Sequence, residues 1–131
     1  MYVTRHYIAV TCDTAGDCTD YTDELCNGFI RAIRYVIDSS TPIASTATIT
    51  ITAEGSGLAV LAITTSSSNR NLYPVSPVNM SSDGAIAYYT TAANSVESQT
   101  AQIPIAQERL KVVVDGGGTG VTGGGIYAYV G

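Results

Sequence analysis

The sequence has few of the residues from which catalytic and metal sites are usually built. Its 131 residues include one histidine, three cysteines and no tryptophan. A hydrolytic triad needs a base beside its nucleophile, and His6, the one candidate, falls in an expected strand. A zinc site needs four ligands, and no C-x-x-C pair is present. We therefore expect no enzyme activity and no cofactor.

Charge is also scarce, since Asp, Glu, Lys and Arg together make up 13% of the residues and the net charge is −5. The six basic residues are scattered, which argues against nucleic acid or an anionic membrane surface as a partner. No apolar run approaches the roughly 18 residues of a transmembrane helix. The first residues lack the basic start and apolar run of a secretory signal, which predicts synthesis in a cytoplasm.

The three cysteines, Cys12, Cys18 and Cys26, all lie in the first fifth of the chain. Their odd number and the missing signal favour reduced thiols that pack in the interior. A disulfide between Cys12 and Cys18 is geometrically possible, because the two would face each other across a hairpin. The same region, Asp13 to Glu24, contains five carboxylates, which leaves a bound cation as an alternative to a solvated hairpin.

What the sequence has in abundance is alternation with a period of two. Residues 48–53 alternate between Thr and Ile or Ala, which predicts a strand with Ile49 and Ile51 facing a core. Residues 29–37 are rich in β-branched and aromatic side chains, and we expect Phe29 to share the core face with Ile33, Tyr35 and Ile37. The nearly continuous apolar run 57–64 predicts a strand that is buried on both faces.

Turn residues between these segments predict hairpins. We expect 6–11 to pair with 17–22 around residues 13–16, and 46–53 to pair with 57–64. The ten residues 116–125 are mostly glycine and lie between expected strands 110–114 and 126–130, which predicts a glycine-rich hairpin loop. The run lacks a lysine and precedes a strand, so it fits neither phosphate-binding fingerprint.

Helical signal is nearly absent, because Pro104 interrupts the single candidate, 101–109. About eight strands with regular turn signals predict one all-β domain over 1–131, a β-sandwich or jelly roll of antiparallel strands. Paired carboxylates for glycoside hydrolysis are conceivable on a jelly roll, but the chain lacks the Trp that lines such grooves, and Glu54, Glu97 and Glu108 have no obvious partner in the sequence. Nine tyrosines favour a protein with contact surfaces.

Five segments follow one another along the chain in a moderately distinctive order, although none is a chemical signature. They are NGFIRAIRY at 27–35, ATITITAEGSGL at 47–58, Tyr73-Pro74, PIAQERLKVVV at 104–114 and GGIYAYVG at 124–131. Through these segments, from residue 27 to the end, the sequence resembles a group of short virion proteins of tailed bacteriophages, whereas the first 26 residues are specific to this chain.

The resemblance implies a capsid decoration, or cement, protein on the exterior of the virion, made in the host cytoplasm. Its implied partners are the major capsid protein and two further copies of itself in a homotrimer. A neck, tail or fibre-tip component stays open, as does a carbohydrate- or receptor-binding sandwich. We expect the first five residues, Met1, Tyr2, Val3, Thr4 and Arg5, to form an N-terminal arm that contacts the capsid or a neighbouring protomer.

Overall fold

A computed structural model describes residues 2–13, 15–38, 40, 42–64, 68–77, 88–90, 96–98, 100–116 and 122–131. In these ranges the chain forms strands and turns and contains no helix, which confirms the all-β prediction. Accordingly, none of these residues belongs to a helix long and apolar enough to span a membrane.

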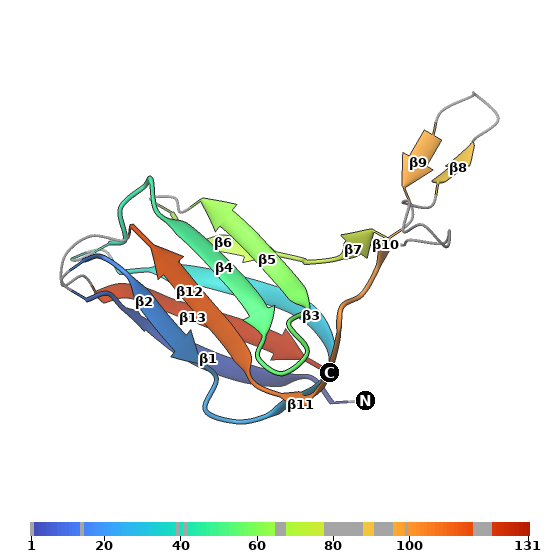
Figure 1. Ribbon diagram of the computed structural model, residues 1–131, viewed down its shortest axis with the longest axis horizontal. Helices are drawn as coiled ribbons and strands as arrows, with labels where there is room; N and C mark the ends of the chain where they lie inside the picture. The colour runs from blue at the N-terminus through green and yellow to red at the C-terminus, as the bar shows by residue number, and fades with distance from the viewer. Residues whose placement is uncertain are drawn as a thin grey trace.

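Two antiparallel sheets form the two layers of a β-sandwich (Figure 1). The first has the order β1-β13-β3-β11, with β6 also paired to β3, and the second has the order β2-β12-β4-β5. The first contains β1 (Thr4–Thr11), β13 (Thr122–Val130), β3 (Cys26–Ile37), β11 (Pro104–Glu108) and β6 (Arg70–Leu72). The second contains β2 (Cys18–Tyr21), β12 (Leu110–Asp115), β4 (Thr48–Ala53) and β5 (Ala59–Thr64).

Two short pairs lie outside the sandwich (Figure 1). In one, β7 (Ser76–Pro77) pairs with β10 (Thr100–Ala101), and in the other β8 (Tyr88–Thr90) pairs with β9 (Val96–Ser98). The two main sheets alone contain nine strands, five and four, so the strand number exceeds the eight or so expected.

The core lies between the two sheets and consists of every second residue of the long strands. On β4, Ile49 and Ile51 are buried while the threonines face outward, as the alternation predicts. Leu110, Val112 and Val114 of β12 lie beside them. The opposite layer contributes the alternating apolar residues of β1 and β13. These are Ile8, Val10, Ile126, Ala128 and Val130.

The predicted hairpin of 46–53 with 57–64 is confirmed by the β4–β5 pairing, but two other hairpins are wrong. β1 pairs with β13 and β2 pairs with β12, so residues 12–17 link the two layers. β12 and β13 also lie in different sheets, so the two strands beside the glycine run do not form the expected hairpin. Residues 117–121 of the run lie outside the described residues, and 122–125 belong to β13. A period of two identifies a strand but carries no information on which strand pairs with it.

The expected core face of residues 29–37 is wrong at its start. A register shift at the Ala32/Ile30 step of β3 passes over Arg31, which is a β-bulge. The extra residue inverts the alternation, so Ile30 is buried together with Ile33 and Tyr35, and Phe29 lies 42% exposed. A bulge depends on the partner strand, which explains why the local pattern did not predict it.

The strand expected to be buried on both faces is an edge strand. Among the described strands β5 pairs with β4 alone, and it alternates between buried or half-buried and exposed residues. Val60 is buried, whereas Leu58, just before the strand, is 44% exposed. A second bulge, beside Ile51 and Thr52 of β4, accounts for the break in this strand's pattern.

Replacing Tyr35 with phenylalanine is expected to leave stability unchanged or raise it by up to about 1 kcal/mol. The Tyr35 side chain is fully buried, and its hydroxyl has no hydrogen-bond partner in the described part of the molecule. Burial also raises the pKa of the hydroxyl. Removing an unsatisfied buried hydroxyl removes its desolvation cost. Urea unfolding measures the change, and a loss above about 1 kcal/mol would show that the hydroxyl has a partner.

Candidate functional site

The structure divides the expected N-terminal arm. Thr4 and Arg5 belong to β1 and pair with Val130 and Tyr129 of β13, so they are part of the sandwich. Tyr2 and Val3 precede the strand and are 92% and 53% exposed. Met1 lies outside the described residues. Within the predicted arm, only the residues before Thr4 therefore lie outside the sandwich and could contact a partner as an arm.

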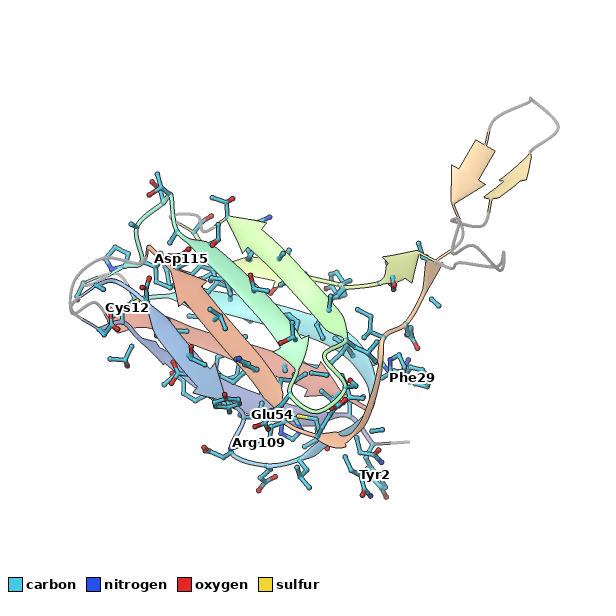
Figure 2. All side chains as sticks on the ribbon, in the orientation of Figure 1. Tyr2, Cys12, Phe29, Glu54, Arg109 and Asp115 are labelled. Atoms are coloured by element: carbon cyan, nitrogen blue, oxygen red, sulfur yellow. The ribbon has the colours of Figure 1, made fainter. Side chains whose placement is uncertain are left out.

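The two ends of the chain meet at one end of the sandwich, which we call the terminal end (Figure 1). Strands β1 and β3 begin there, β13 finishes there, and the β2–β3 and β4–β5 connections lie at the same end. Figure 2 shows Tyr2 and Phe29 here, at the opposite end from Cys12. Of the eight large apolar side chains that are exposed among the described residues, five belong to this end: Tyr2, Val3, Leu25, Phe29 and Leu58. Such clustering is typical of a contact surface.

The C-terminus helps to hold this surface in place. The Gly131 amide donates a hydrogen bond to the Phe29 carbonyl at 3.0 Å, and the Arg31 Nε donates to the Gly131 carbonyl at 2.6 Å. The Arg31 guanidinium also lies over the Phe29 ring, 5.8 Å from its centre, and donates to Gln102 Oε1 at 2.9 Å. The exposed Phe29 ring is thus supported by its neighbours, and a rigid aromatic anchor loses little conformational entropy when a partner binds.

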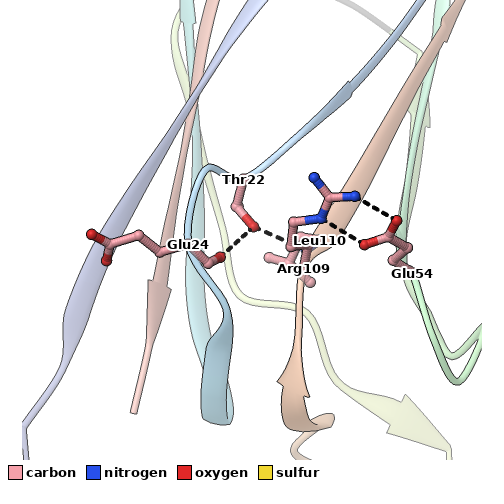
Figure 3. Close-up of polar contacts among 5 residues, drawn as sticks. All are labelled: Thr22, Glu24, Glu54, Arg109 and Leu110. Carbon is pink, nitrogen blue, oxygen red and sulfur yellow. Dashed lines mark hydrogen bonds and ion pairs between the residues drawn. The ribbon is translucent and has the colours of Figure 1, made fainter.

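A polar clamp fixes the β4–β5 turn to the β11–β12 corner at the same end (Figure 3). Arg109 makes a two-pronged ion pair with Glu54, with both N–O distances 2.7 Å, and lies 4.6 Å from the centre of the Tyr21 ring. The neighbouring Glu108 accepts hydrogen bonds from Ser56, at 2.7 Å from its amide and 2.8 Å from its hydroxyl. The turn that precedes Leu58 is therefore fixed by two sets of bonds, one through Glu54 and one through Ser56.

Thr22 joins the β2–β3 connection to the same corner (Figure 3). Its fully buried hydroxyl donates to the Glu24 carbonyl at 2.9 Å and accepts from the Leu110 amide at 3.2 Å. The Cys26 thiol contacts the same hydroxyl at 3.7 Å. These bonds give the loop that carries Leu25 a fixed path.

The clamp is expected to weaken in acid. The hydrogen bonds from Arg109 lower the pKa of Glu54, and those from Ser56 lower the pKa of Glu108, below the ordinary value of 4.5. Because both pKa values are lower in the folded state, their stabilisation is present above the unfolded pKa and is lost as pH falls through the folded pKa. Between about pH 6 and pH 3, the urea midpoint should fall more for the wild type than for a Glu54→Gln/Glu108→Gln variant. Equal falls would contradict the assignment.

A second surface lies on the outer side of the five-stranded sheet, and we call it the Tyr/Arg face. Tyr7 of β1, Tyr127 of β13 and Arg34 of β3 are neighbours in the register across three strands, and Arg5 lies opposite Tyr129. The rings of Tyr7 and Tyr127 are 4.9 Å apart, and the Arg5 guanidinium lies 5.3 Å from the centre of the Tyr127 ring.

On this face an aromatic ring packs closely on a glycine, and two arginines lie among the tyrosines. The Tyr7 ring covers Gly125, where a Cβ would overlap it. Arg5, Arg34, Tyr127 and Tyr129 border a shallow depression of about 290 Å³ together with Val36. Within the described part of the chain, neither Arg5 nor Arg34 forms an ion pair. The face therefore presents two guanidinium groups among aromatic rings on an acidic protein.

The acidic stretch from Asp13 to Glu24 does not gather into one site. Asp13 accepts hydrogen bonds from the Ala15 and Asp17 amides at 2.8 and 3.0 Å, and Asp17 accepts from the Gly116 amide at 3.2 Å. Among the described residues, no group of three or more His, Cys, Asp or Glu side chains has the arrangement of a metal site. The first two carboxylates are engaged by backbone amides at a turn.

Comparisons with protein-family models, with curated proteins and with solved structures found no match. The sequence-based site named the first five residues but missed the other members of the terminal end. Phe29 was assigned to the core, and the partners of Glu54 and Glu108 lie 55 and 52 residues away in sequence. The excess of tyrosine was the one sequence signal that pointed to the Tyr/Arg face.

Proposed function

We propose that the protein is a structural component of a tailed-phage virion that decorates the outside of the capsid. It stabilises the shell by bridging subunits of the major capsid protein, and it acts as a homotrimer. The sequence resemblance over residues 27–131 suggests this role. The observation that carries the docking surface is the gathering of Tyr2, Val3, Leu25, Phe29 and Leu58 at the terminal end.

The chemistry of this end suits attachment to a protein shell. Exposed aromatic and aliphatic side chains, held by neighbouring bonds, supply the apolar centre of an interface, and the Arg109 and Glu54 charges at the same end are already paired with each other. The same contact is repeated at every symmetry-related position of a shell, so a modest gain per site is multiplied over the particle. The proposal requires neither a catalytic residue nor a cofactor.

The test uses particles of the phage whose genome encodes this sequence. Purified protein is mixed with particles that lack it and sedimented, and the bound copies are counted by quantitative mass spectrometry. Decoration predicts hundreds of copies per particle. About six or twelve copies would instead indicate a neck or tail component, which follows the symmetry of a single vertex. No binding at micromolar concentration would overturn the proposal.

The second candidate function, a carbohydrate- or receptor-binding module, is favoured by the Tyr/Arg face. Tyrosine rings stack on sugar rings, and unpaired guanidinium groups bind carboxylates, so the ligand would be an anionic glycan. Polysialic acid should then bind in a salt-sensitive way, and neutral dextran should not. Tyr127→Ala and Arg34→Ala should abolish binding measured by calorimetry, whereas Lys111→Ala, which removes a charge from the other sheet, should not.

A further inference from the structure

The turn between β1 and β2 brings two cysteines together at the end of the sandwich opposite the terminal end. The Asp13 amide donates to the Asp17 carbonyl at 2.9 Å, and the Gly16 amide donates to the Asp13 carbonyl at 3.1 Å. Cys12 and Cys18 immediately flank this closed turn. Continuing the pairing by one residue on each side places them opposite each other.

Both side chains pack against the core. Cys12 is 4% exposed, Cys18 is half-buried against the same core cluster, and the two thiols are close enough to affect each other's pKa. Directly opposed residues of antiparallel chains have Cα atoms about 4.5–5.5 Å apart. Disulfides span Cα separations of about 4.4–6.8 Å, so a bond can close here without moving the backbone far.

The third cysteine is separated from this pair. Cys26 begins β3 at the terminal end, where its thiol contacts the Thr22 hydroxyl at 3.7 Å and the Glu24 carbonyl at 3.9 Å. Cys12 lies at the other end of the sandwich (Figure 2). One intramolecular pairing is therefore favoured over the other two.

We propose that Cys12 and Cys18 form a reversible disulfide that ties β1 to β2 when the protein meets an oxidising medium. Because β1 and β2 belong to different sheets, the bond fastens the two layers together at the end away from the terminal end. The inference stands on the turn and on the packing of both cysteines against one core cluster, and it does not depend on the proposed capsid role.

The reaction with a small disulfide such as glutathione disulfide balances in two exchanges. The more accessible Cys18 thiolate attacks one sulfur of the oxidant, forms a mixed disulfide and releases one glutathione. The Cys12 thiolate then attacks Cys18 Sγ, forms the internal bond and releases the second glutathione. One disulfide is consumed, one is formed, and the two protein thiols lose two electrons and two protons to the glutathione pair.

The surroundings slow this exchange near neutral pH. Burial and the nearby Asp20 carboxylate raise the pKa of the Cys18 thiol to about 12. Burial, together with Asp13, Asp17 and Asp20, also raises the pKa of Cys12. Thiolates are the attacking species, so oxidation should accelerate as pH rises from about 7 to 9.

The experiment incubates the reduced full chain with glutathione disulfide, alkylates free thiols in denaturant and measures the intact mass. One alkyl group is expected in place of three, and digestion before aspartate should give a cross-linked fragment, because Asp13 and Asp17 lie between the two cysteines. The oxidised protein should melt roughly 5–10 °C higher than the reduced one.

Matched variants separate this pairing from others. Cys26→Ser should oxidise and gain thermal stability as the wild type does, whereas Cys18→Ser should do neither. Should Cys18→Ser fold poorly, the digest of the wild type still identifies the bond. A stable glutathione adduct, a cross-link to Cys26, an intermolecular dimer or three alkylated thiols would each overturn the proposal.

Discussion

Replacing Gly124 with alanine is expected to lower the free energy of unfolding by more than about 3 kcal/mol. Gly124 has φ +103°, a backbone conformation that side chains rarely adopt, and it lies opposite Ile37 where β13 pairs with β3. A Cβ at this position would overlap the Val36 carbonyl oxygen and lie 2.9 Å from the Asp38 amide nitrogen. Both obstacles are backbone atoms, one in β3 and one in the residue that follows it, so neither can move away by a side-chain rotation.

Gly57 provides the matched control. It also has positive φ, +74°, but a Cβ there would have no neighbour within 4 Å. Gly57→Ala should therefore cost only the conformational strain, about 1–2 kcal/mol. Urea unfolding of the two variants separates strain from overlap. Equal losses would show that the β13–β3 pairing yields at Gly124 and that the overlap carries no cost of its own.

The two glycines also show what the sequence could and could not predict. The β4–β5 hairpin was predicted because its strands and its short turn are adjacent in sequence, so local signals suffice. The pattern of the glycine-rich segment predicts a hairpin loop, yet Gly124 and Gly125 lie within a strand. Gly125 lies beneath the Tyr7 ring, and that strand is more than a hundred residues away. A local pattern cannot distinguish a glycine that makes a loop flexible from a glycine whose missing Cβ leaves space for another side chain.

The layers of the sandwich were unpredictable for the same reason. Strand alternation places Ile49 and Ile51 in the core, where both are buried, because burial of one face requires a period of two. Whether the next strand stays in the sheet or crosses to the other layer depends on long-range pairing. The bulge at Arg31 shows the consequence, since one extra residue exchanged Phe29 for Ile30 in the core. The unpredicted register shift therefore led to a wrong prediction of which residue, Phe29 or Ile30, is exposed.

That exchange leads to the largest functional effect that we expect. Phe29→Ser should weaken binding to capsid particles at least about 30-fold, the loss typical of an aromatic residue at the centre of an interface. The ring is 42% exposed in the free protein and stands beside the other apolar residues of the terminal end. Its backbone keeps the bond from Gly131 in the variant, so the fold should persist. Co-sedimentation at a series of protein concentrations measures the affinity.

Tyr73→Ser is the matched control, because Tyr73 is 73% exposed but borders a depression on the outer sheet surface with Ala32, Arg34 and Tyr129 and is not one of the apolar residues that define the terminal end. It removes a larger exposed aromatic area and should leave capsid affinity within about twofold, as most residues outside an interface centre do. If Tyr73→Ser weakens binding and Phe29→Ser does not, the capsid contact lies along the outer sheet surface. If both variants bind as the wild type does, the terminal end is not the docking surface. If capsid affinity falls in Phe29→Ser alone, the capsid contact includes the Phe29 ring, which is exposed because the β3 bulge at Arg31 puts Ile30 in the core in its place.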